Sequence, residues 1–146
     1  MKSASSRARG TSGAVSLEFV LIFMTFFTIF LAVCDLARFW VTTNSVRTLA
    51  SELVRQTLIY CATQSQTTVC ALPSTGTHSI ATAEATVPFL GTSGFASTPS
   101  ASRSTINATT GFMGITASAG YNFSFVLPVW RGTTITEVSQ NTQLGY

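Results

Sequence analysis

Residues 14–33 form an apolar stretch whose only charged side chain is Glu18. Twenty residues of α-helix rise about 30 Å, which matches the hydrocarbon core of a bilayer. A carboxylate inside such a stretch costs roughly 2.5–3.5 kcal/mol on insertion scales, so Glu18 needs a partner or a function. The stretch therefore predicts a transmembrane helix with one informative acid near its start.

Basic residues precede this stretch and set its orientation. Lys2, Arg7 and Arg9 account for the whole formal net charge of +3, because basic and acidic residues balance beyond Gly13. The positive-inside rule then leaves the N-terminus in the cytoplasm and the C-terminal region outside it. A secretory signal peptide is the competing interpretation, but the stretch is longer than a usual h-region and no small-x-small motif follows it. A nucleic-acid-binding surface is not expected from this charge distribution.

The second half of the helix is expected to be amphipathic. Residues 34–62 contain no proline or glycine, and Val46, Leu49 and Leu53 begin a stripe that Leu58 or Ile59 continues. One helix over residues 14–62 would be about 70 Å long. Its weak point is residues 42–45 (TTNS), where poor helix formers favour a bend or local melting.

Charged and aromatic residues follow the apolar stretch closely. Asp35 and Arg38 are spaced to form an ion pair on the helix, and Glu52 and Arg55 have the same spacing. We expect both pairs to be solvated surface charges worth a few tenths of a kcal/mol. The neighbouring residues 39–40 (FW) fit either an interfacial aromatic belt or contacts between subunits.

The cysteines agree with an exported region. Cys61 and Cys70 close a short loop and are expected to form a disulfide, with two free thiols as the alternative. Cys34 lies at the membrane boundary without an evident mate, and a lipoprotein cleavage there is disfavoured by the long, acid-containing apolar stretch. His78 is the only histidine, so no zinc site and no cofactor is expected.

The C-terminal region predicts a small antiparallel sheet packed on the helix, which makes the fold class α+β. Residues 115–127 alternate between an apolar and a polar face, and residues 133–139 return as a second strand after a turn at 128–132. Residues 79–87 give a weak strand. Residues 88–111 are expected to be a long surface loop, because small and polar residues dominate them.

Catalytic chemistry is not expected from this sequence. After Glu18 and Asp35 are assigned to the helix, the remaining acids show no paired spacing, and His78 stands alone. The N-x-[ST] sequons at Asn107 and Asn122 are interpreted as chance matches. An enzyme is therefore improbable.

Three segments together carry a resemblance to a known family. Residues 13–19 (GAVSLEF) place a glycine, a following Ala14 and an acid at the start of the apolar run; residues 34–40 read CDLARFW; residues 121–128 (YNFSFVLP) precede a second strand at 132–136 (GTTIT). These segments are similar to those of TadE-like pseudopilins, in the Tad (Flp) branch of the type IV pilin superfamily. The resemblance implies a pilin-like fold and cleavage by prepilin peptidase between Gly13 and Ala14. It further implies that Glu18, followed by Phe19, pairs with the freed Ala14 amine of a neighbouring subunit and sets the filament register.

The chain therefore divides into a basic leader (1–13), a transmembrane or filament-core helix (14–33), its amphipathic extension (34–62) and an extracytoplasmic β-rich region (63–146). We expect a minor pilin or pseudopilin, first in the bacterial inner membrane and then in a Tad-type adhesion filament. Its expected partners are other pilin subunits, prepilin peptidase, the inner-membrane assembly platform and membrane lipid. The alternatives are a main filament subunit and an uncleaved single-pass membrane protein whose outer domain binds a partner.

Overall fold

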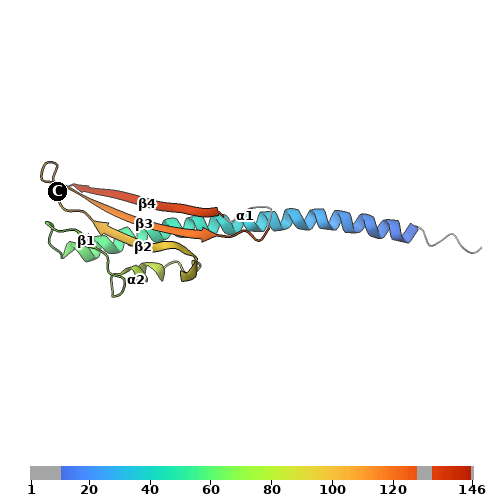
Figure 1. The fold of residues 1–146 in the computed structure, drawn as a ribbon, viewed down its shortest axis with the longest axis horizontal. Helices are drawn as coiled ribbons and strands as arrows, with labels where there is room; N and C mark the ends of the chain where they lie inside the picture. The colour runs from blue at the N-terminus through green and yellow to red at the C-terminus, as the bar shows by residue number, and fades with distance from the viewer. Residues whose placement is uncertain (1–10, 128–132, 146) are drawn as a thin grey trace, which may run out of the picture.

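The computed structural model describes residues 11–127 and 133–145, and it confirms the α+β fold. Helix α1 (Thr11–Ala62) is 52 residues long, and its second half packs along a four-stranded antiparallel sheet with the strand order β1-β2-β3-β4 (Figure 1). The first half of α1 projects from this head as a single rod. The remaining elements are β1 (Cys70–Ala71), α2 (Ile80–Glu84), the 3-10 turn η1 (Thr92–Gly94), β2 (Phe95–Arg103), β3 (Phe112–Phe123) and β4 (Thr133–Gly145).

Helix α1 continues without interruption through residues 42–45, where a bend or local melting was expected. The hydroxyl groups of this segment turn back onto the helix itself. Thr42 donates to the carbonyl of Arg38 at 2.8 Å, and Thr43 donates to that of Phe39 at 2.9 Å. Such bonds to the carbonyl four residues earlier satisfy the hydroxyl groups within the helix, so these poor helix formers do not compete with it here.

The predicted apolar stripe of α1 forms the core of the head. Val46, Leu49 and Leu53 are fully buried against Ile115, Ala117 and Ala119 of β3. The two alanines leave room for the leucines of the helix, so that large and small side chains interdigitate. The packing of α1 on the sheet is thus confirmed.

The strand predicted at residues 79–87 is wrong, because this segment forms the short helix α2. Ser79 caps it, and its hydroxyl oxygen accepts a hydrogen bond from the Thr82 backbone N–H at 3.2 Å. Alanines at every second position resembled strand alternation, but alanine is also the strongest helix former. Ala83 alone is fully buried, and it joins the core beside α1.

The long loop predicted at residues 88–111 is also wrong, since β2 lies within it and pairs with β3. The pairing has register shifts between Phe95 and Ser100, beside Pro99. Gly94 precedes the strand and lies so close to Tyr121 that a Cβ atom there would overlap the tyrosine ring. Glycine at this position lets the tyrosine ring lie directly against the backbone, and a larger residue would displace the ring.

Strand β3 confirms the predicted alternation but ends at Phe123, so residues 124–127 leave the sheet. Strand β4 contains the predicted residues 133–139 and continues to Gly145. It pairs with β3 along its length, with Ile135 opposite Tyr121 and Leu144 opposite Met113. The turn predicted at residues 128–132 lies outside the described residues.

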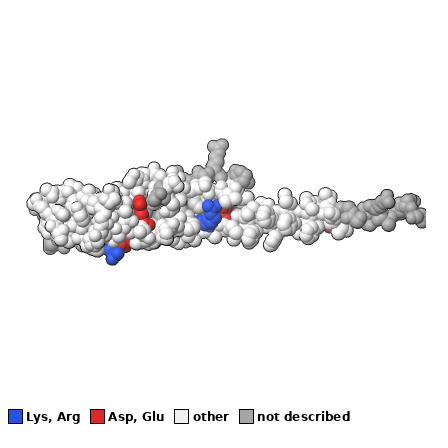
Figure 2. All heavy atoms as spheres, turned by 90° about the horizontal axis from the view of Figure 1, so that it is seen from below, with Lys and Arg blue, Asp and Glu red and all other residues white. Residues whose placement is uncertain are grey.

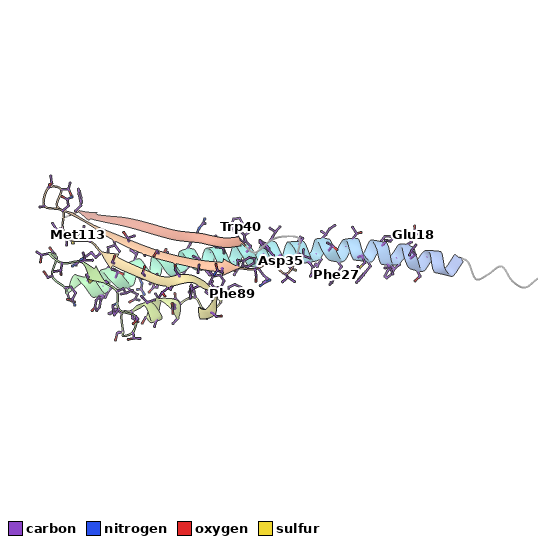
Figure 3. All side chains as sticks on the ribbon, viewed as in Figure 1. Glu18, Phe27, Asp35, Trp40, Phe89 and Met113 are labelled. Carbon is purple, nitrogen blue, oxygen red and sulfur yellow. A yellow bond between two sulfur atoms is a disulfide. The ribbon has the colours of Figure 1, made fainter. Side chains whose placement is uncertain are left out.

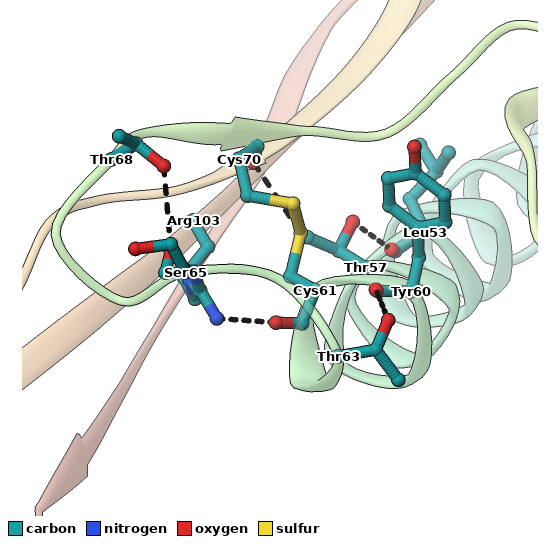
Figure 4. The surroundings of a disulfide bond; sticks show 9 residues. All are labelled: Leu53, Thr57, Tyr60, Cys61, Thr63, Ser65, Thr68, Cys70 and Arg103. Atoms are coloured by element: carbon teal, nitrogen blue, oxygen red, sulfur yellow. Dashed lines mark hydrogen bonds between the residues drawn. A yellow bond between two sulfur atoms is a disulfide. The ribbon is translucent and has the colours of Figure 1, made fainter.

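The end of α1 is fixed by a disulfide and a buried arginine (Figure 4). Cys61, in the last turn of α1, is bonded to Cys70 of β1. Arg103 of β2 is almost fully buried and donates to the carbonyl oxygens of Cys61 and, at 2.7 Å, Ser65. A cation at the carbonyl end of a helix also interacts favourably with the helix dipole. Helix, loop and sheet are therefore joined at one point.

Replacing both Cys61 and Cys70 with serine is expected to lower the free energy of unfolding of the head by about 2–3 kcal/mol, as the chain-entropy treatment gives for a short loop. Thermal unfolding of the full chain in detergent measures this loss. Cys34→Ser is the matched control, since Cys34 is exposed and forms no disulfide. An unchanged melting temperature in the double variant would contradict the stabilising role of the bond.

Candidate functional site

The first half of α1 is an exposed apolar surface. Every side chain from Val15 to Phe30 is exposed, including five phenylalanines. Figure 2 shows this region as a narrow white rod that leads away from the charged residues of the head. Among the described residues, one helix is long and apolar enough to cross a membrane, with a mean hydropathy of 2.5 over its most apolar window. A surface of this size requires lipid or other helices around it.

Glu18 lies near the outer end of this surface, far from the head (Figure 3). The backbone of α1 is helical from Thr11, so the Gly13–Ala14 bond lies in its first turn. Glu18 follows Ala14 by four residues, which is about 6 Å along the axis. Phe19, Phe23 and Phe27 stack in a row beside it, with ring centroids 6.2 and 5.9 Å apart. Within the described part of the chain, no side chain forms an ion pair with Glu18.

Asp35 is not the solvated surface charge that its spacing predicted, because it is only 2% exposed. Its carboxylate accepts hydrogen bonds from the backbone N–H groups of Val126, at 3.0 and 3.2 Å, and Leu127, at 3.0 Å. Arg38 donates to the same carboxylate at 3.3 Å. The N–H of Leu127, then that of Val126 and the Arg38 cation hold the pKa of this carboxyl below its usual value, against the effect of burial. Asp35 thus fastens the segment after β3 to α1.

An aromatic cluster surrounds this attachment. Phe39 packs edge-on against Phe123 at 5.6 Å between ring centroids and stacks on Phe125 at 6.2 Å. The Arg38 guanidinium lies 5.5 Å from the Phe123 ring centroid. Phe39 therefore makes contacts within its own chain. Trp40 is 66% exposed and is accessible to lipid or to another protein.

The second acid–arginine pair of α1 lies on the surface of the head. Arg55 donates two hydrogen bonds to Glu52, at 2.7 and 2.8 Å, and Gln56 donates a third. The hydrogen bonds from Arg55 lower the pKa of Glu52. His78 bonds to Gln56 at 2.8 Å rather than to a carboxylate. These residues form a polar network without a nucleophile, in which Arg55 is exposed and Gln56 is buried at 4% exposure. No metal-binding group of three or more His, Cys, Asp or Glu occurs in the described residues.

The comparison with protein families finds a match over much of α1. Residues 13–55 match the family model of TadE-like proteins. The TadE-like segment begins at Gly13, contains Glu18 and the Asp35 attachment, and ends within the core-forming half of α1. The match confirms the resemblance seen in the sequence and indicates a role connected with the Tad pilus, in a family that is not one of enzymes. No curated protein and no solved structure matches the chain at a significant level.

Sequence reasoning missed the residues that hold the head onto the helix. The amides of Val126 and Leu127 bind an acid 91 and 92 residues earlier, and backbone groups carry no sequence signal for such a contact. Arg103 gave a weak signal, as a single cation within an otherwise small and uncharged segment. A buried cation of this kind requires fixed acceptors, and here helix-end carbonyls supply them.

Proposed function

We propose that this protein is a minor pilin or pseudopilin, cut by prepilin peptidase after Gly13 and assembled through α1 into a Tad-type pilus, or at its start, for adhesion. One combined observation carries the proposal: an apolar half-helix, exposed throughout residues 15–30, bears a single acid, Glu18, and the TadE-like match begins at Gly13. The exposed surface supplies the area for helix packing. Glu18 sets the axial register between neighbouring α1 helices.

The chemistry follows from what the cut creates. Removing the leader converts the Ala14 nitrogen into an amine that is mostly protonated at neutral pH. A cation and a carboxylate in an apolar filament core are both costly when alone, and pairing between neighbouring subunits offsets part of that cost. The pair also fixes the axial offset of the two helices, because only one offset brings Glu18 to a neighbour's Ala14.

The proposed life of the protein begins in the inner membrane, with the N-terminus in the cytoplasm and the head outside. Prepilin peptidase and an assembly platform in that membrane would act on this form. The apolar half of α1 then exchanges lipid for the helices of other pilin subunits, which present surfaces of the same chemistry. No cofactor takes part in this proposal.

Mass spectrometry of the protein from native membranes is expected to show Ala14 as the N-terminal residue. Gly13→Leu is expected to abolish the cut, since a bulky side chain replaces hydrogen next to the scissile bond. Gly10→Ala is the matched control within the leader and should be cut normally. Protein that still begins at Met1 or Lys2 would favour the uncleaved single-pass membrane protein.

A further inference from the structure

The level of α1 just beyond the apolar half carries exposed apolar side chains from three separate segments. Trp40 of α1 is 66% exposed, Phe89 after α2 is 57% exposed, and Val126 after β3 is 64% exposed. Figure 3 shows Trp40 and Phe89 at the same level along the molecule, on opposite sides of α1. Val126 is tied to this level by its hydrogen bonds to Asp35. We call these three residues the apolar collar.

Phe89 is held outward by its neighbours. Val87 and Leu90 are both buried, and a turn with a hydrogen bond of 2.9 Å joins the Leu90 N–H to the Val87 carbonyl. The ring of Phe89 instead lines a hollow of about 310 Å³ together with Arg38 and Thr42 of α1. Because Val87 and Leu90 are buried, the Phe89 ring between them is held on the surface, where it can contact a partner.

The length of the apolar stretch indicates where the collar lies relative to the bilayer. Residues 19–34 separate Glu18 from Asp35 without a charge, and at 1.5 Å per residue they span about 24 Å. With the residues from Ala14 to Glu18 added, the apolar stretch matches the hydrocarbon core of about 30 Å, so Asp35 lies at the outer boundary of that core. The collar lies within about two helical turns of Asp35, which brings it into the headgroup region.

The charged groups at this level are also compatible with a position in the headgroup region. A bare carboxylate would resist the boundary of the hydrocarbon, but that of Asp35 is enclosed by two backbone N–H groups and by Arg38. The half-exposed Arg38 guanidinium faces outward beside Phe89, where lipid phosphate oxygens are available to it. Tryptophan, here Trp40, is one of the two aromatic residues that are enriched at membrane–water interfaces.

We propose that the head sits directly on the outer leaflet of the inner membrane, with the apolar collar of Trp40, Phe89 and Val126 embedded among phospholipid headgroups and Arg38 bound to their phosphates. This inference rests on the membrane-anchored stage of the proposed function. It adds a second attachment, made by the head itself, which must be released before the subunit leaves the bilayer.

The test uses single tryptophans in the full-length protein. In a Trp40→Phe, Trp130→Phe background, Phe89→Trp reports on the collar, and Phe112→Trp reports on the opposite end of the head, where Phe112 is similarly exposed at 48%. Each variant is reconstituted into vesicles of phosphatidylcholine and phosphatidylglycerol, in which part of the phosphatidylcholine carries a nitroxide on its headgroup in both leaflets. The headgroup quencher is expected to quench the Phe89→Trp variant as strongly as it quenches Trp40 in the Trp130→Phe protein, and at least about twofold more than the Phe112→Trp variant.

Two results would overturn the proposal, and they are distinguishable. Equal, weak quenching of the Phe89→Trp and Phe112→Trp variants in protein that floats with the vesicles would show that the head stands off the membrane. Failure to float with the vesicles at all would remove the membrane anchor, and with it the proposed function as well. Before each measurement, the melting temperature of the variant is compared with that of the wild-type protein to verify that the variant is folded and its disulfide is intact.

Discussion

Replacing Glu18 with alanine is expected to abolish incorporation of the protein into filaments while it remains in the membrane. The Ala14 amine of a neighbour would then be buried without its carboxylate, and removing one partner of a buried ion pair costs about 3–5 kcal/mol. This corresponds to a loss of about a hundredfold or more in the equilibrium for subunit addition. Immunoblotting of sheared filaments against the membrane fraction measures the effect.

Thr28→Val is the matched control for Glu18→Ala on the same exposed surface. The Thr28 hydroxyl donates to the carbonyl of Met24 at 2.8 Å, so it is satisfied inside its own helix and its loss should leave assembly unchanged. The N-terminus of the Glu18→Ala protein is sequenced in parallel, which separates an assembly defect from a processing defect. Normal filament content in a correctly cut Glu18→Ala protein would refute the register role.

Replacing Asp35 with alanine is expected to detach residues 124–127 from α1 and to destabilise the head. The amides of Val126 and Leu127 lose a charged acceptor together, and Arg38 loses its partner. Bonds to an ionised acceptor are the stronger kind, so we expect the melting temperature to fall by roughly 10 °C or more. Hydrogen exchange at the two amides should accelerate in the same variant.

Glu52→Gln is the matched control for Asp35→Ala, because Glu52 and Arg55 have the same spacing on the same helix. The Arg55 side chain is 63% exposed and remains solvated when the pair is lost, and the amide oxygen of glutamine still accepts hydrogen bonds, so the melting temperature should change by no more than a few degrees. Equal effects of the two substitutions would contradict the attachment role of Asp35.

Acid is expected to weaken the same attachment. The pKa of Asp35 is lower in the folded protein than in the unfolded chain, where it is about 3.9. Its contribution is therefore complete above the unfolded pKa and is lost as the pH falls through the folded pKa. Asp35→Asn should remove this part of the pH dependence of the melting temperature, whereas wild-type protein should retain it.

The long helix and its core stripe could be predicted because their signals are local and periodic. Leu49 and Leu53 recur at helical spacing in a segment without glycine or proline, and residues 115–123 alternate strictly. The strand predicted at residues 79–87 was wrong for a local reason as well. The alternating alanines fit a strand or a helix, but Ser79 is a typical N-cap residue of a helix. Counting the cap would have corrected it.

Strand β2 and the Asp35 attachment could not be predicted from local patterns. Strand β2 is rich in serine and alanine, and it is a strand because β3 offers it an edge and α1 covers Ala101. Asp35 looked like its counterpart Glu52, since both precede an arginine by three residues. What distinguishes the two acids is the chain segment that folds back onto one of them, and only the tertiary structure contains that information.

The disulfide at the end of α1 has a mechanical consequence. The strands run alongside the helix axis (Figure 1), so a pull between the anchored rod and the far tip of the head loads their contacts in shear rather than peeling them apart in turn. The weak place under such a load is the last turn of the helix, where peeling would begin. The bond between Cys61 and Cys70 closes that place covalently, so under such a load the end of α1 stays attached to β1.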